Sequence, residues 1–159
     1  MRLSLVELVL LAAAVAVAAS ALPSFFGGGS SRSAVRASWT LTPGVLNPDV
    51  GQANIMSTIC RRGWTRTIRP PVSYTNVLKT KGLHQYGLRG PPSSFQEDHL
   101  ISLELGGDPV DPRNLWPEPY PRASAVDRIE NDLNHRVCTG SLSLADAQRR
   151  ESALKHRDG

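Results

Sequence analysis

The sequence predicts a domain of the α+β class, and three features of residues 95–138 indicate it. Residues 95–101 have the composition of a short strand, and the glycines and prolines that follow them predict a loop. A second extended run begins at Asn114 and is ended by Pro117. From Ala123 to Cys138 the apolar residues recur at helical spacing. The expected order is therefore strand, loop, strand and helix.

Residues 1–21 are predicted to be a signal peptide. The stretch 8–19 is an uninterrupted apolar run, preceded by Arg2 and followed by small residues that suit a cleavage site. Such a run is too short to cross a bilayer core of about 30 Å as a helix. An uncleaved anchor over residues 3–22 is the alternative. We expect an exported protein without stable membrane association after cleavage.

Residues 22–41 are expected to be a flexible linker, because they contain a glycine and serine tract at 27–31 and few apolar residues. The predicted domain then spans residues 42–159, with its core at 95–138. This length suits a single domain, and we expect a monomer.

Elements before the core are less strongly marked. Residues 52–59 are compatible with either helix or strand. Residues 64–69 alternate large and charged side chains, which predicts a strand with one wet face. Ser73 is the expected N-cap of a helix over residues 74–86, which Gly87 would end.

Two helices are expected at the C-terminal end of the chain. The apolar stripe of the first is predicted to face the strands, and it consists of Val126, Ile129, Leu133 and Val137. Ser143 and Asp146 resemble the start of a capping box, which would open a last helix. We expect that helix to fray toward Gly159.

Cys60 and Cys138 are the two cysteines of the sequence. An exported chain meets an oxidising compartment, so the even number predicts a disulfide between them. No further Cys or His lies near either residue at the spacing of a structural zinc site.

Three segments carry the strongest motif: Glu97-Asp98-His99-Leu100-Ile101, Gly106-Gly107 and Asn114-Leu115-Trp116-Pro117. Together with the following helix they resemble the ββα-metal nucleases, and within these the His-Asn-His (HNH) endonuclease group. The resemblance covers Phe95 to Cys138, and the final His or Asn of the motif has no single match. More loosely, residues 42–148 look like small exported actinobacterial-type proteins of uncharacterised function that carry this core.

The resemblance implies a nuclease that hydrolyses phosphodiester bonds with one divalent cation, Mg²⁺ or Mn²⁺. His99 is the expected general base, because imidazole titrates near neutral pH. Asp98 is the expected metal ligand, since hard cations prefer carboxylate oxygens. By resemblance, Asn114 would hydrogen-bond across the loop and help to orient the base. The alternative for His99 is a buried histidine with a purely structural role.

The helix is expected to supply the other side of the metal site. Asp127 and Asn131 are four residues apart on one flank, so both could reach one ion, and we expect one of them to be a direct ligand. His135 lies opposite the apolar stripe and is expected to be exposed to solvent. His84 and His156 receive no predicted role.

Charge is unevenly distributed, although the net formal charge is only +4. Residues 60–96 contain basic but no acidic side chains, whereas the charged side chains of residues 97–119 are acidic except for Arg113. A basic segment attracts phosphates, so it predicts a nucleic-acid surface formed by Arg61, Arg62, Arg66, Arg69, Lys79 and Lys81. The alternative is an ordinary solvated surface. Trp64, Tyr74 and Tyr86 could stack on bases, but we expect them in the core.

Three functions stay open at this point. The first is an exported, metal-dependent endonuclease acting on DNA or RNA. The second is a non-catalytic exported module that binds nucleic acid or other polyanions with the same scaffold. The third is a structural exported domain, for which neither nucleic-acid binding nor metal dependence is expected. The choice between DNA and RNA, and the existence of an inhibitor protein, are left open.

Overall fold

Residues 35–158 are described by the computed structural model, so the predicted signal peptide and residues 22–34 of the predicted linker lie outside the described part. The helices and strands are α2 (Trp64–Ile68), α3 (Val72–Gln85), β1 (Phe95–His99), β2 (Leu115–Pro119), α4 (Arg122–Cys138) and α5 (Leu144–Arg157). Short 3-10 helices lie between them: η1 (Gln52–Ser57), η2 (Pro92–Ser94), η3 (Leu103–Leu105) and η4 (Pro112–Asn114). The predicted α+β class is confirmed.

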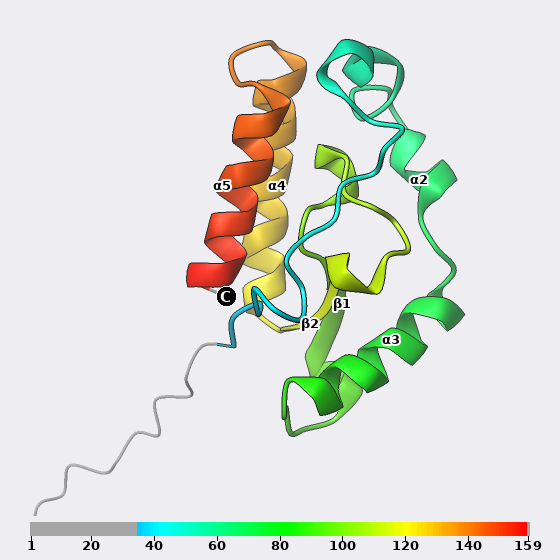
Figure 1. Ribbon diagram of the computed structural model, residues 1–159, viewed down its shortest axis with the longest axis vertical. Helices are drawn as coiled ribbons and strands as arrows, with labels where there is room; N and C mark the ends of the chain where they lie inside the picture. Colours follow the sequence, from blue (N-terminus) through cyan, green and yellow to red (C-terminus); the bar gives the residue numbers. More distant parts are fainter. Residues whose placement is uncertain (1–34, 159) are drawn as a thin grey trace, which may run out of the picture. The chain divides into compact units, whose positions relative to one another are not determined.

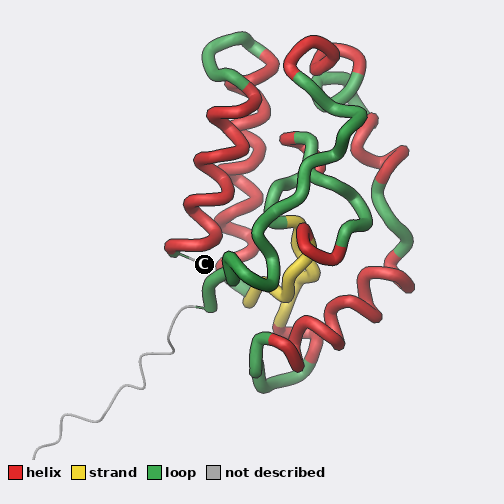
Figure 2. The backbone as a smooth tube through the Cα atoms, in the orientation of Figure 1, coloured by secondary structure: helices red, strands yellow, loops and turns green. Residues whose placement is uncertain are grey.

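The two strands form an antiparallel hairpin with helices on both of its faces (Figure 1). Asp98 pairs with Trp116, and the neighbouring His99 pairs with Leu115. Because side chains alternate along a regular strand, these two pairs would point to opposite faces if the strand continued beyond His99. Helix α3 packs on one face and α4 on the other, and α5 lies beside α4 and runs antiparallel to it (Figure 1). Loops and short 3-10 turns connect β1 to β2 (Figure 2).

Helix α4 buries a stripe that differs from the predicted one. Its buried side consists of Ala123, Val126, Glu130, Leu133 and Val137. Three of the four predicted apolar positions are correct, but Ile129 is wrong, because it is 38% exposed. Glu130 occupies the buried turn between Val126 and Leu133 instead, so an acidic side chain points toward the sheet and α5.

Helix α5 begins as predicted but does not fray. The hydroxyl of Ser143 accepts a hydrogen bond from the main-chain nitrogen of Asp146 at 3.1 Å, as an N-cap does. The helix continues to Arg157, and Lys155 and His156 in its last turn are buried. The predicted fraying is wrong because these two side chains are held by partners elsewhere in the fold.

The predicted strand over residues 64–69 is wrong, because residues 64–68 form helix α2. Gly63 precedes the helix with a φ of 83°, which favours glycine. Pro70 disfavours helical geometry at Arg69, so the helix ends there after little more than one turn. Alternation of large and charged residues over six positions suits a strand and one amphipathic turn equally well. The undecided segment 52–59 contains the 3-10 helix η1.

Ordered structure begins before the predicted domain start at residue 42. Ala37 is buried, and its main-chain nitrogen donates to the carbonyl oxygen of Lys155 at 3.1 Å. The ring of Trp39 stacks on His156 with ring centres 3.5 Å apart. Residues that looked like linker by composition therefore pack against the end of α5.

The main apolar core lies between the hairpin loop and the two C-terminal helices. It is formed by Ile59, Ile101, Leu105, Leu133, Val137, Leu142, Leu144 and Ala147. Burying one such aliphatic side chain contributes about 1.5–3 kcal/mol, so this cluster fixes α4 and α5 on the loop. None of the helices within residues 35–158 has the length and apolar character required to span a membrane.

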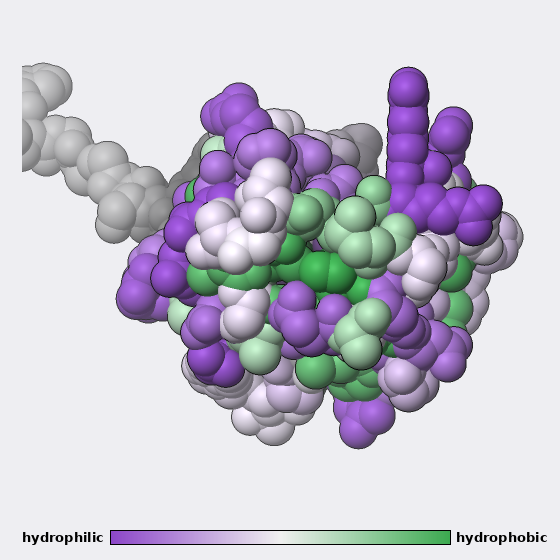
Figure 3. All heavy atoms as spheres, turned by 90° about the horizontal axis from the view of Figure 1, so that it is seen from above, coloured by the Kyte–Doolittle hydropathy of each residue, from purple (hydrophilic) through white to green (hydrophobic). Residues whose placement is uncertain are grey.

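Apolar side chains also reach the surface. Seen from the end where α4 is joined to α5, a band of apolar residues lies between polar and charged ones (Figure 3). Trp39, Met56 and Val72 are each more than 60% exposed. Scattered exposed apolar residues are normal on a small domain, so we assign them no partner.

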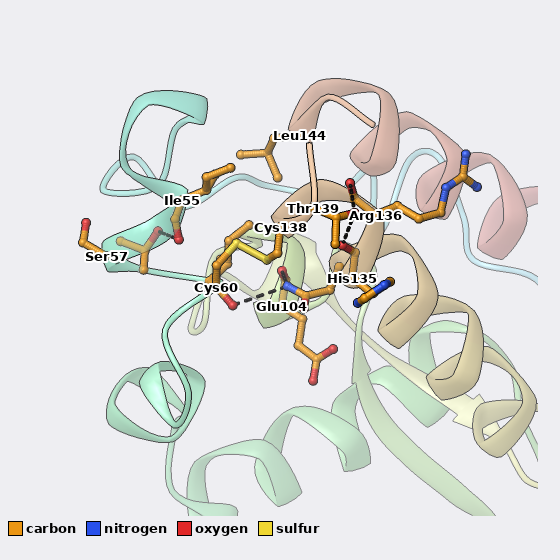
Figure 4. Close-up of a disulfide and its surroundings, with 12 residues drawn as sticks. Ile55, Ser57, Cys60, Glu104, His135, Arg136, Cys138, Thr139 and Leu144 are labelled. Atoms are coloured by element: carbon orange, nitrogen blue, oxygen red, sulfur yellow. Dashed lines mark hydrogen bonds between the residues drawn. A yellow bond between two sulfur atoms is a disulfide. The ribbon is translucent and has the colours of Figure 1, made fainter. Parts of the chain in front are cut away.

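The predicted disulfide is confirmed. Cys60 is bonded to Cys138, with Cα atoms 5.5 Å apart and a sequence separation of 78. The bond joins the segment that follows η1 to the last turn of α4, next to Glu104 (Figure 4). Nearby, the side-chain amide of Asn134 donates to the carbonyl oxygens of Ile59 and Glu104 at 3.3 and 2.8 Å.

Replacing both cysteines by serine should lower the free energy of unfolding by about 4–5 kcal/mol, because the unfolded chain regains the freedom of a long closed loop. Urea unfolding of the two proteins would measure this difference. Dithiothreitol should produce the same loss in the unsubstituted protein and none in the double variant. Equal midpoints for all samples would contradict the stabilising role of the bond.

Candidate functional site

A polar cleft of about 230 Å³ lies where β1 ends, between η3 and α4. The structure brings five predicted site residues to this cleft: Arg69, Asp98, His99, Asp127 and Asn131. Its remaining lining residues are Gln96, Ser102, Leu103, Glu104 and Glu130. Residues that are far apart in the sequence therefore form one charged depression.

His99 is the last residue of β1, and this position explains how it reaches the same cleft as Asp98. Within a regular strand the two side chains would be separated by the sheet. The ring nitrogen Nε2 lies 3.1 Å from the carbonyl oxygen of Pro109. A carbonyl oxygen can only accept, so Nε2 carries the proton in the neutral ring, and Nδ1 holds the lone pair.

The electrostatic surroundings keep His99 neutral. Burial lowers the pKa of His99, and the positive charges of Arg69 and Lys155 act in the same direction. The hydrogen bond to Pro109 and the charge of Asp98 oppose the shift without cancelling it. The imidazole is therefore available as a proton acceptor at neutral pH.

Asn114 does not line the cleft but organises the loop behind it. Its side-chain oxygen accepts from the main-chain nitrogen of Ile101 at 2.9 Å, and its amide donates to the carbonyl oxygens of Ile101 and Asp108 at 3.0 and 2.9 Å. Asp108 precedes Pro109, whose carbonyl holds His99. The Asn114 side chain is therefore hydrogen-bonded to the loop that carries the Pro109 carbonyl.

Glycine is required where this loop folds over Asn114. A Cβ at Gly107 would lie 1.8 Å from the carbonyl oxygen of Ile101 and 2.7 Å from the Asn114 amide nitrogen. The preceding Gly106 has a φ of 76°, which disfavours other residues. Gly106 therefore allows the turn, and Gly107 allows the backbone to approach Ile101 and Asn114 closely.

Asp98 is not a free carboxylate, contrary to the expectation for a metal ligand. Its Oδ2 lies 2.7 Å from Nζ of Lys155, a residue with no exposed surface. The same ammonium lies 2.6 Å from Oε1 of Glu130 and 3.4 Å from Oε1 of Glu151. It also donates to the main-chain oxygen of His99. One buried cation therefore joins β1, α4 and α5.

The cluster balances its charge by shifting protonation. Burial opposes charge on Asp98, but the charge and hydrogen bond of Lys155 outweigh it and lower the pKa of Asp98. Burial raises the pKa of Glu130 well above its usual value, and it also raises the pKa of Glu151. The pKa of Glu118 rises to about 8 through burial and the nearby charge of Asp98. Lys155 and Asp98 thus form the charged pair.

Four members of this cluster were missed in the sequence: Glu118, Glu130, Glu151 and Lys155. A signal was present, because Glu151 and Lys155 follow Leu144 and Ala147 at helical spacing, on the buried side of α5. Charged residues of opposite sign on an apolar stripe indicate a buried ion pair.

As they stand, the cleft residues do not fit a divalent cation. Within residues 35–158, no group of three or more His, Cys, Asp or Glu side chains is placed to hold a metal ion. Asp98 is engaged by Lys155. On the helix flank, the Asn131 amide donates to the main-chain oxygen of Asp127 at 2.7 Å, so this side chain is turned back onto its own helix.

The predicted basic surface divides into parts. Arg69 lines the cleft, and Arg61 and Arg62 line a second depression of about 220 Å³ that shares Glu104 with it. Arg66 is exposed on α2. None of these four arginines forms an ion pair with another residue of the described part of the chain.

The two lysines of the predicted surface lie on α3, away from these depressions. Nζ of Lys79 donates to the carbonyl oxygen of Phe95 at 3.1 Å. Lys81 lines a third pocket, together with Thr42 and Tyr86. The structure therefore does not bring all six predicted basic residues to one place.

The other histidines differ in their surroundings. His84 and His135 are exposed, the latter as expected. His156, which received no predicted role, is buried, and its Nε2 lies 3.0 Å from the carbonyl oxygen of Thr42. It fastens the first described segment to α5.

No protein-family model, curated protein or solved structure matches the chain. The chemistry of the cleft is therefore interpreted from its own residues.

Replacing Glu118 by Gln should flatten the pH dependence of stability between pH 4.5 and 8. Folded Glu118, with a pKa of about 8, keeps a proton that the unfolded chain loses near 4.5, so stability falls as pH rises through this window. The slope from one such proton is at most about 1.4 kcal/mol per pH unit. Urea unfolding at several pH values would measure it. The matched control Asp49→Asn changes an exposed carboxylate, and an equal flattening there would contradict the assignment to Glu118.

Proposed function

We propose that the protein hydrolyses phosphodiester bonds in nucleic acid, with His99 as the general base. The observation that carries this proposal is the neutral His99 ring, which Pro109 holds at the wall of a cleft. The same cleft presents Arg69, which forms no ion pair with any residue of the described part of the chain. Such a reaction requires at least a proton acceptor and, beside it, a cation that can contact a phosphate.

The order of elements gives the proposal further support. A hairpin carrying Asp98 and His99 is followed by helix α4, which brings Asp127 and Asn131 to the same cleft. This is the arrangement that the resemblance to ββα-metal nucleases implies. Assignment of the chain to that fold family is part of the proposal.

In the proposed reaction, Nδ1 of His99 takes a proton from a water molecule. The water oxygen forms a bond to phosphorus, the bond from phosphorus to the leaving nucleotide oxygen breaks, and that oxygen takes up a proton from solvent. Arg69 binds the phosphoryl oxygens, on which negative charge increases. Asn114 keeps the loop, and through it the imidazole, in place.

The requirement for Mg²⁺ or Mn²⁺ stays a prediction of the resemblance. Because Asp98 is engaged by Lys155, no step of the proposed reaction is assigned to a bound cation. Export is also part of the proposal, and the disulfide agrees with an oxidising compartment.

A second function is favoured by one observation. If Asp98 is needed as a metal ligand, its ion pair with Lys155 leaves a scaffold that binds nucleic acid or other polyanions without cleaving them. Arg61, Arg62 and Arg69 would then provide the binding surface. Cleavage of a labelled oligonucleotide, measured beside binding of the same probe, separates this function from the first.

Replacing His99 by Ala should reduce cleavage of single- and double-stranded oligonucleotides by about 100-fold or more, because general base catalysis contributes this much. The activity of the unsubstituted protein should fall at acid pH with a midpoint below 6.5, since the pKa of His99 is lowered. His135→Ala changes an exposed histidine on α4 and serves as the matched control. Cleavage that survives in His99→Ala, or that is absent in the unsubstituted protein at every pH and metal concentration, would reject the catalytic proposal.

Replacing Arg61 and Arg62 together by Gln should weaken oligonucleotide binding and lower the slope of log K against log salt by up to about 2, one unit for each lost phosphate contact. Fluorescence anisotropy at several salt concentrations would measure the slope. Lys81→Gln lies at a different pocket and should change it less. An equal effect of Lys81→Gln would extend the binding surface to α3, as the sequence predicts.

A further inference from the structure

We infer that the ammonium of Lys155 is a built-in cation, which takes the place at Asp98 that the resemblance would give to a divalent metal ion. The site accordingly keeps its charge balance without a bound metal. This inference concerns the site of the proposed function, but the geometry of Lys155 supports it independently of any catalytic activity.

The surroundings of Nζ resemble those of a hard cation. Oxygen atoms of Asp98, Glu130 and Glu151 lie 2.7, 2.6 and 3.4 Å away, and the main-chain oxygen of His99 is a fourth neighbour. Carboxylate and carbonyl oxygens are the ligands that Ca²⁺ and Mg²⁺ prefer. The three protons of the ammonium are directed to Asp98, Glu130 and His99, so an acidic cradle is filled by a side chain of the protein itself.

Burial makes this arrangement difficult to exchange. Lys155 has no exposed surface, and Glu151 has none either. Removing one partner from a buried charge pair leaves an uncompensated charge, which is strongly unfavourable. A divalent ion could take the place of the ammonium at Oδ2 of Asp98 only by displacing it from Glu130, Glu151 and the His99 carbonyl as well.

The position also explains why the lysine belongs to the site rather than only to α5. Nζ contacts the carboxylate of Asp98 and the carbonyl of His99, the two adjacent residues at the end of β1. Lys155 is separated from them by 57 and 56 positions in the sequence. Lys155 is therefore a positioning residue for both predicted site residues, and it does not itself line the cleft.

Metal binding to the unsubstituted mature protein gives the first test. Equilibrium dialysis against MnCl₂ should find no stoichiometric ion that depends on Asp98, and addition of MnCl₂ or CaCl₂ should leave the melting temperature unchanged. One tightly bound Mn²⁺ per chain that is lost in Asp98→Asn would overturn the inference. This measurement needs no variant of Lys155.

The second test removes the ammonium from its carboxylate and carbonyl partners. Lys155→Ser should melt at a lower temperature, and millimolar CaCl₂ or MnCl₂ should raise its melting temperature by about 3 °C or more, because an ion that binds the folded state stabilises it. The rise should disappear in Lys155→Ser/Asp98→Asn. Lys81→Ser, at an exposed lysine of α3, is the matched control and should show no metal effect. A folded Lys155→Ser protein without metal-dependent stabilisation would overturn the inference, and if it does not fold, dialysis decides.

Failure of the proposed function can be distinguished from failure of this inference. If no nucleic acid is cleaved, the catalytic proposal fails, whereas the dialysis and melting results still decide the role of Lys155. If cleavage requires Mn²⁺ that binds through Asp98, the catalytic proposal stands and the built-in cation is rejected. Cleavage that persists in excess chelator supports both.

Discussion

The buried ammonium of Lys155 is the constraint on which the rest of the site depends. It joins the end of β1 to α4 and α5 through Asp98, Glu130 and Glu151, and neither Lys155 nor Glu151 has exposed surface. Burying several charged groups is unfavourable unless they are paired. The sheet and both helices therefore have to meet with their charged residues in register, and this requirement makes the arrangement specific even where its net contribution to stability is small.

Asn114 provides a second, neutral constraint on the other side of the hairpin. Its hydrogen bonds hold Ile101 and Asp108, and the latter lies beside the carbonyl that orients His99. The ion-pair network of Lys155 and the hydrogen-bond network of Asn114 meet at the end of β1. Asp98 belongs to the first network, and His99 is held by the loop that the second network fixes. The cleft is consequently polar and has hydrogen-bonded residues on both sides, which agrees with the proposed role of His99 as a base held in one orientation.

Comparison of Asp98 with His99 shows how neighbouring residues can acquire different chemistry. Both are buried, but the ammonium keeps the carboxylate charged, whereas burial keeps the imidazole neutral. A site with a fixed internal cation, a neutral imidazole and an arginine that forms no ion pair with residues 35–158 agrees with the phosphate ligand of the proposed function. It is less suited to recruiting a metal ion, and this conflict with the resemblance is the main functional question that the structure raises.

Several features followed from the sequence by itself, because they rest on local pattern. The α+β class, the hairpin around Asp98 and His99, helix α4 and the cap at Ser143 depend on periodicity, glycines and short-range hydrogen bonds. The disulfide followed from the even number of cysteines in a chain that was expected to be exported. Residues 64–69 were assigned to the wrong element because so short a pattern fits a strand and a helical turn. Only the tertiary structure decided which residues are the partners of Asp98, that Glu130 is buried instead of its neighbour Ile129, and what Lys155 does. The reason is that a charged residue becomes a buried ion-pair partner only when distant elements bring its counter-charge to within hydrogen-bonding distance.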